Sequence, residues 1–188
     1  MPYKDGIVMD ISPKELLEPF TVVAQSGLRD WGSLHPLIIH FPIALLLIAP
    51  IFILLGLVFR KSLKIFSICS LILMWLGTAA IFLSVFTGEA ASRHLPSTTE
   101  ILETFEEHAE FAEQTRLAFV ILTILWTLYV VLLLPKPSKP MASIHWGFLS
   151  LFLIGYTYSV VLLLNTAHYG GKLVHHHGVH TNLYETPH

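Results

Sequence analysis

The chain has 188 residues, of which 54% are hydrophobic and only 13% are charged, and its mean hydropathy is +0.66. Water-soluble domains usually carry about 25% charged residues, so this composition excludes an ordinary soluble globular protein. The formal net charge of −2 argues against a nucleic-acid partner. The single cysteine, Cys69, excludes an internal disulfide and a metal site built from paired cysteines.

The first 33 residues precede the apolar part of the chain. Ser12, Pro13 and Glu15 form a helix-start pattern, and apolar residues at helical spacing follow between Leu16 and Val23. We therefore predict an outer-side arm over residues 1–33 that contains an amphipathic helix lying on the membrane surface.

Four later stretches contain no Asp, Glu, Lys or Arg, and each is long enough to cross a bilayer, which takes about 17–25 helical residues. They cover residues 36–59, 65–86, 117–134 and 141–166. The predicted fold is an all-α integral membrane protein, with a four-transmembrane-helix bundle over residues 34–167.

The third helix is expected to be longer than its membrane span. Residues 97–116 carry an apolar stripe and a glutamate stripe at helical spacing, and no Gly or Pro separates them from the third apolar stretch. We predict one helix of about 37 residues, roughly 55 Å long, whose first turns stand above the membrane. Together with the N-terminal arm and the C-terminal tail, this extension would form an outer-side cap.

Basic residues in the short connections predict the orientation. The first connection carries Arg60, Lys61 and Lys64, and the third carries Lys136 and Lys139, so both are expected to face the cytoplasm. Both termini, the middle connection and the histidine-rich tail over residues 168–188 would then lie outside.

This topology gathers the histidines on one side of the membrane, because all of the 11 histidines except His145 fall on the outer side. Pro42 removes a helical hydrogen-bond donor and should bend the first helix beside His40. Gly170 and Gly171 would let the tail fold back over the bundle. The candidate ligands of a cofactor or metal are His40, His108 and His177, with His35 and His168 as alternates.

Imidazole binds haem iron, copper and zinc, and helical bundles build such sites from facing side chains. Small residues such as Gly77 and Gly88 recur along the second span, where they would permit close helix packing or leave room for a flat cofactor. Arg93 and Arg116 could pair with the propionates of haem b. A copper or zinc site, and histidines that are merely polar surface groups, stay open as alternatives.

Two other classes of function have little support. The four spans contain no Asp, Glu, Lys or Arg, whereas ion-coupled transporters usually place ionisable groups there. The sequence also has neither the Gly-x-Ser-x-Gly elbow of a serine hydrolase nor the His-Glu-x-x-His pair of a zinc hydrolase.

Residues 35–44, with the sequence HPLIIHFPIA, resemble the opening motif of an uncharacterised bacterial membrane family, domain of unknown function 2231. Further matches are Thr87-Gly88, the segment around His108, and the pattern over residues 170–179, while the extra histidines at positions 175, 176 and 180 depart from the family. The resemblance covers Trp31 to Val179 and implies a multi-pass protein of a bacterial inner membrane, whose outer side is the periplasm. Some relatives resemble proteins joined to, or encoded near, cytochrome c modules, which favours redox work.

We therefore predict a membrane-bound, b-type cytochrome-like redox or electron-transfer subunit with a histidine-ligated haem on the outer side. Its partners would be the lipid bilayer, cytochrome c-type or other respiratory proteins, and quinone, with an oligomer left open. The alternatives are a non-catalytic membrane protein that binds copper or zinc, and a structural subunit of a membrane complex.

Overall fold

The structure is a computed structural model that describes residues 30–93, 95–96, 98–133 and 142–179, together with positions 12, 17 and 21. Every element within the described ranges is helical. The surface helix predicted in the N-terminal arm lies almost wholly outside the described residues.

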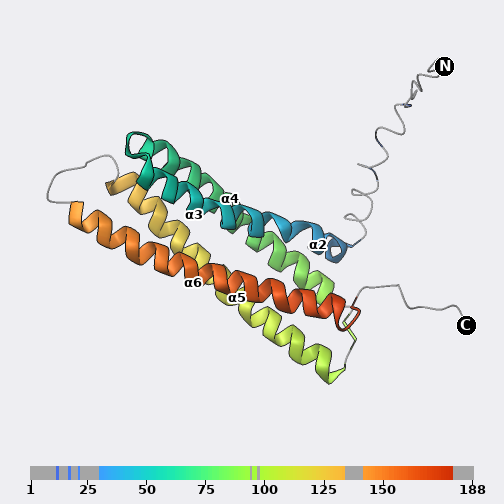
Figure 1. Cartoon of the computed structure of the whole chain (residues 1–188). Coiled ribbons are helices and arrows are strands. Elements are labelled where there is room, and N and C mark those ends of the chain that lie inside the picture. The colour runs from blue at the N-terminus through green and yellow to red at the C-terminus, as the bar shows by residue number, and fades with distance from the viewer. Residues whose placement is uncertain are drawn as a thin grey trace, which may run out of the picture.

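Four long helices pair as two hairpins (Figure 1). In the first, a 3₁₀ turn η1 (Trp31–Leu34) leads into α2 (His35–Ile38) and α3 (His40–Val58), and a second turn η2 (Arg60–Ser62) leads into α4 (Leu63–Ser92). In the second, α5 (Thr99–Leu128) continues as the π-helical η3 (Tyr129–Leu133), and α6 (Ala142–His175) returns beside it. The uninterrupted passage from α5 into η3 agrees with the long third helix predicted from the sequence.

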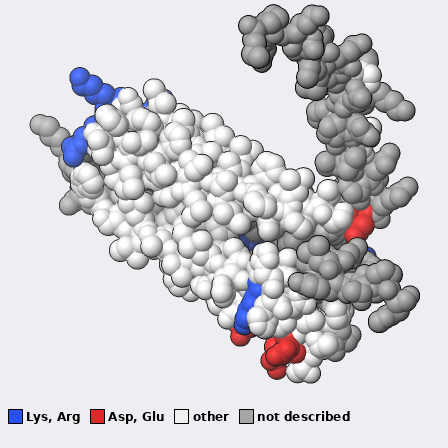
Figure 2. Space-filling model, turned by 45° about the vertical axis from the view of Figure 1, so that its right-hand side comes forward, with Lys and Arg blue, Asp and Glu red and all other residues white. Residues whose placement is uncertain are grey.

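The four long helices are apolar enough to span a membrane, over Trp31–Val58, Arg60–Ser92, Thr99–Leu132 and Trp146–His175. A helix is favoured in lipid because it satisfies its backbone hydrogen bonds internally. Large apolar side chains point outwards along all four helices, and the surface between the charged ends is almost free of charge (Figure 2). The predicted all-α, four-helix membrane fold is confirmed.

The predicted distortion beside His40 is present as a break between two helices. α2 ends at Ile38, Ile39 is a turn residue, and α3 begins at His40. Pro42 has no N–H to donate to the Ile38 carbonyl, which explains why the regular pattern is interrupted at this point.

The tail reverses later than predicted. We expected Gly170 and Gly171 to fold the tail back, but α6 runs through both glycines to His175. The reversal takes place at Gly178, whose φ of 65° lies in the left-handed region that glycine adopts without strain. The Val179 N–H then donates to the Leu173 carbonyl over 3.1 Å, and Val179 packs with Leu173 and Ile101. The tail therefore contacts the start of α5.

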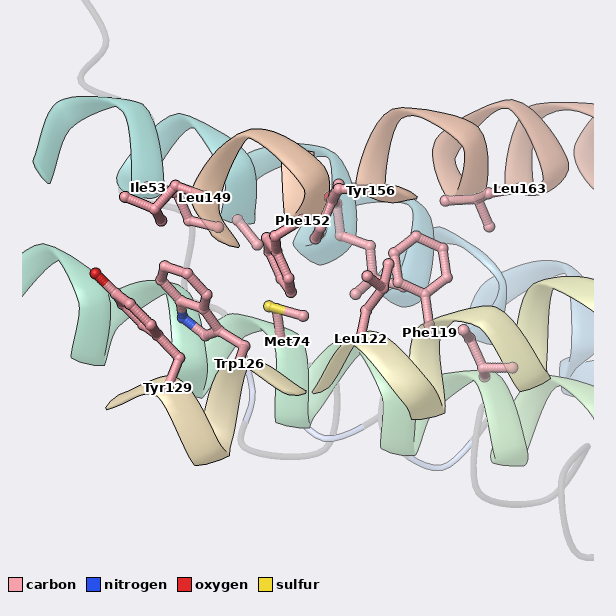
Figure 3. Close-up of a cluster of buried hydrophobic side chains, with 13 residues drawn as sticks. Ile53, Met74, Phe119, Leu122, Trp126, Tyr129, Leu149, Phe152, Tyr156 and Leu163 are labelled. Atoms are coloured by element: carbon pink, nitrogen blue, oxygen red, sulfur yellow. The ribbon is translucent and has the colours of Figure 1, made fainter. Parts of the chain in front are cut away.

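The core is filled by aromatic side chains toward the basic end, which we define as the end that carries Arg60, Lys61 and Lys64. Trp126 stacks on Tyr129 with 4.9 Å between ring centroids and lies 4.8 Å from Phe152 (Figure 3). Its indole N–H donates to the Ser67 carbonyl over 3.3 Å, which joins α5 to α4. The opposite end of the bundle, where α2 and α5 begin and α4 and α6 end, is called the histidine end (Figure 1).

Candidate functional site

The histidine end brings three half-buried imidazoles together with hydroxyl and carbonyl groups. His35 lies at the start of α2, His108 lies three turns into α5, and His177 follows the end of α6. The spacing of these three positions along the chain does not reveal that they share one end. Their positions follow from the antiparallel course of the helices.

The start of α2 is fixed by the turn that precedes it. The Asp30 carboxylate accepts a hydrogen bond from the Gly32 N–H over 2.9 Å. A Cβ added to Gly32 would lie 2.8 Å from the backbone of Ala91, so only glycine lets this turn lie so close to α4. Trp31 adds an edge-to-face contact with Phe86 at 6.0 Å. These contacts place His35 beside the last turns of α4.

His35 is held by Thr87 of α4. Its Nδ1 lies 3.1 Å from the Thr87 hydroxyl oxygen. That hydroxyl also lies 3.0 Å from the Leu83 carbonyl and 3.1 Å from the Ser84 carbonyl, and carbonyls can only accept. Donating to a bare Nδ1 would give the Thr87 hydroxyl one hydrogen bond, whereas donating its proton within α4 and accepting from Nδ1–H of His35 gives it two. In the neutral ring the second arrangement leaves the lone pair on Nε2.

Gly88 makes room for the His35 ring. A Cβ at this position would lie 3.1 Å from Cε1 of His35, which is tighter than ordinary van der Waals contact. Thr87 and Gly88 thus act on the same imidazole in two ways. The threonine supplies the acceptor for Nδ1–H, and the glycine leaves space for the ring.

His108 has the same arrangement in the other hairpin. Its Nδ1 lies 2.9 Å from the Thr166 carbonyl, which can only accept, so Nδ1 carries the proton and Nε2 carries the lone pair of the neutral ring. A Cβ on Gly170 would lie 3.1 Å from Cε1 of His108. The Thr166 side chain is itself fixed, because it donates to the Leu162 carbonyl and lies 3.0 Å from the Thr115 hydroxyl.

The two imidazoles meet across the boundary between the hairpins. His35 is bonded within the first hairpin and His108 within the second, yet the rings are close enough to interact electrostatically. The 3.1 Å hydrogen bond of His35 and the 2.9 Å hydrogen bond of His108 both use Nδ1 and not Nε2. The pair therefore presents two imidazole lone pairs at the junction of the two halves of the bundle.

His177 makes its hydrogen bond through Nε2 instead of Nδ1. Its Nε2 lies 3.0 Å from the Thr104 hydroxyl, and that hydroxyl donates to the Glu100 carbonyl over 2.9 Å. Thr104 therefore accepts from Nε2–H, and the lone pair of the neutral His177 ring lies on Nδ1. This hydrogen bond attaches the tail to α5 and occupies the nitrogen that the hydrogen bonds of His35 and His108 described above do not use.

The hydrogen bonds of His35 and His108 described above do not involve the other predicted site residues. His40 is exposed at the start of α3, and His168 is exposed beside the ring of Tyr169. Arg93 is exposed at the end of α4. Arg116 pairs with Glu113 over 2.6 Å, and its guanidinium carbon lies 5.6 Å from the centre of the Phe82 ring. His94 and His180 lie outside the described residues.

The N-terminal half of α5 also carries an acidic groove of about 400 Å³, which is lined in addition by residues of the last turns of α6. Glutamates are visible at this end of the molecule in Figure 2. The groove is lined by Glu103, Thr104, Glu106, Glu107, Glu110, Tyr169 and Lys172. Among the described residues, no three side chains of His, Cys, Asp or Glu form a group that could hold a metal ion.

The hydroxyl and carbonyl partners of the histidines were not predicted from the sequence. Thr87 was noted only as a match to the family pattern, Gly88 also as one of the small residues of the second span, and the partners Thr104 and Thr166 were not singled out. A threonine at the level of a histidine in a neighbouring helix is a usable signal, but it requires the relative depth of the two helices.

The sequence model of a family described as "Predicted membrane protein (DUF2231)" matches residues 32–183. The chain belongs to this family. The match includes His35, Thr87, Gly88, His108 and His177, so the contacts of the three histidines lie within the family's domain. No curated protein and no solved structure matches the chain. The family assignment establishes a membrane protein and leaves its activity to be argued from the site.

Proposed function

We propose that the chain is a haem-binding electron-transfer subunit of the membrane, with haem b held between His35 and His108. The observation that carries this proposal is the matched state of the two imidazoles. Each ring donates through Nδ1 to a fixed oxygen and keeps its lone pair on Nε2. Histidines that bind metals usually have this arrangement, because the second N–H is held by a carbonyl, a carboxylate or water.

The donor set fits haem better than zinc. A haem needs only one or two axial ligands from the protein, and two imidazoles can supply both. Structural zinc sites take four protein ligands and catalytic sites take three, whereas the described residues bring only two imidazoles together here. When bound, the haem iron would supply a one-electron redox couple. Cys69 is the single cysteine, so the two-cysteine attachment motif of a c-type haem is absent from the sequence and the b type is proposed.

The proposal changes the order of the ligands predicted from the sequence. His108 stays a first choice, and His35 moves from alternate to partner. His177 moves down because its Nε2 is bonded to Thr104. His40 and His168 move down because both are exposed.

Orientation and partners follow as part of the same proposal. Arg60, Lys61 and Lys64 at the basic end favour a cytoplasmic location for that end. The histidine end would then face the periplasm, where a cytochrome c-type protein or another respiratory protein could exchange electrons with the haem. Quinone from the bilayer is the proposed partner on the membrane side.

The test is a reduced-minus-oxidised optical spectrum of the detergent-purified protein, expressed with ample haem, followed by a pyridine haemochrome assay. One b-type haem per chain is expected. His35→Ala and His108→Ala should each lose most of the haem or change its ligation, while His40→Ala and His168→Ala should keep the spectrum of the unsubstituted protein.

A colourless protein would refute haem binding. Metal analysis of that sample would then show whether copper or zinc is bound instead, or whether the bundle has a structural role without a cofactor. A haem that persists in both His35→Ala and His108→Ala would leave a haem protein but refute the ligand pair.

A further inference from the structure

The hydroxyl of Thr87 is placed to control which nitrogen of His35 carries the proton. Neutral imidazole has one N–H and one lone pair, and the hydrogen bond made by one nitrogen sets the state of the other. Thr87 makes the most hydrogen bonds when it faces His35 as an acceptor, with its own proton donated to the Leu83 or Ser84 carbonyl. Of the two neutral forms, only the one protonated at Nδ1 makes this bond.

We propose that Thr87 is the positioning residue of the site, holding His35 as the Nδ1–H tautomer so that Nε2 is available to bind a cofactor. The inference rests on the proposed function for the role of Nε2, but the tautomer itself does not depend on any bound group. Thr87 is 1% exposed, so water has little access to replace its hydroxyl.

The two histidines differ in what holds Nδ1–H, and only for His35 is the partner a side chain. In His108, Nδ1–H is held by a backbone carbonyl, that of Thr166, which no substitution removes. His35 also has a backbone partner, the Ser84 carbonyl, but its 3.1 Å hydrogen bond is to the Thr87 hydroxyl. A single substitution can therefore remove the side-chain partner of His35, whereas His108 has a backbone partner only.

The substitution Thr87→Val keeps the shape of the side chain and removes the acceptor. Thr87→Ser keeps the acceptor and serves as the conservative variant. Thr157→Val is the matched control, because Thr157 also donates to the carbonyl four residues before it, over 2.9 Å, and lies on the exposed face of α6.

The experiment is long-range ¹H–¹⁵N correlation of the full-length protein in detergent micelles, with ¹⁵N-labelled histidine and no added haem, at a pH where the rings are neutral. His35→Asn identifies the His35 signals by their loss. We expect the Nδ1–H tautomer for His35 in the unsubstituted protein, in Thr87→Ser and in Thr157→Val. In Thr87→Val we expect a mixture or the Nε2–H tautomer.

Two outcomes would overturn the proposal. An Nε2–H tautomer for His35 in the unsubstituted protein would do so even if Thr87→Val failed to fold. A pure Nδ1–H tautomer in Thr87→Val would show that the Ser84 carbonyl suffices. Haem titration adds a second readout, in which Thr87→Val should weaken binding about 10- to 100-fold and Thr87→Ser much less. If no variant binds haem, the proposed function fails while the tautomer result still stands.

Discussion

The two ends of the bundle are built from different side chains. At the basic end, large aromatic rings such as Trp126, Tyr129 and Phe152 fill the space between helices. At the histidine end, half-buried imidazoles lie over glycines, and their polar atoms are bonded to hydroxyl and carbonyl groups. The first arrangement maximises contact between helices, while the second keeps two rings at defined positions and protonation states.

The two ends also differ in whether their contacts join the two hairpins. Rigid aromatic packing at one end joins the two hairpins, since Trp126 of α5 bonds to Ser67 of α4 and Tyr156 of α6 donates to the Leu46 carbonyl of α3 over 2.7 Å. At the other end, each histidine is bonded inside its own hairpin. The hydrogen bonds of His35 and His108 do not join the two hairpins at this end. A cofactor bound to both Nε2 atoms would join them.

The largest expected effect on stability is at the aromatic core. Trp126→Ala should destabilise the protein by about 3–5 kcal/mol, because it removes a large side chain that is 1% exposed and leaves a cavity. Denaturant titration in detergent, followed by circular dichroism, measures this change. The matched control is Trp75→Ala, where the indole is 53% exposed and a loss of about 1 kcal/mol or less is expected. Equal losses at the two positions would mean that the aromatic core is not what joins the hairpins.

A second prediction compares two neighbouring glycines of α6. Gly170→Ala would place a Cβ 3.1 Å from the His108 ring, so a loss of about 1–3 kcal/mol is expected as the ring is displaced. At Gly171 nothing lies within 4 Å of an added Cβ, and Gly171→Ala should instead stabilise the helix by about 0.5–1 kcal/mol. The same titration measures both variants. Similar effects at the two positions would show that the ring of His108 does not lie over Gly170.

The smallest effect is expected at the tail. His177→Ala removes the hydrogen bond to Thr104, worth about 0.5–1.5 kcal/mol, and amide exchange at Val179 should speed up by roughly 2- to 12-fold. His177→Gln should keep the slow exchange, because the Gln amide nitrogen can replace Nε2–H as donor. His175→Ala, at an exposed position, is the control. Faster exchange in His177→Gln than in His177→Ala would contradict the hydrogen bond between His177 and Thr104.

Much of the fold could be predicted from local pattern. The four spans follow from charge-free stretches, and the break beside His40 follows from the missing N–H of Pro42. The turn of the tail could not be predicted in the same way. Both Gly170-Gly171 and Gly178 permit a reversal, and the choice depends on contacts made across the bundle, namely His108 over Gly170 and Val179 against Ile101.

The candidate site was predictable only in part. The sequence predicted that the histidines gather on one side of the membrane, and it included His35, His108 and His177 among the candidates. It ranked His40 above His35, which was named only as an alternate. In the structure the two positions face different directions, and His35 is the one that meets α4.

The sequence alone therefore determined the membrane class, the helical fold and the location of the histidines along the helices, because these depend on local hydrophobicity and backbone chemistry. Only the tertiary structure decided which histidines come near one another and which oxygen each ring bonds. Those features depend on the depth and rotation of helices far apart in the chain, which bring Thr87 to His35, the Thr166 carbonyl to His108, and Thr104 to His177.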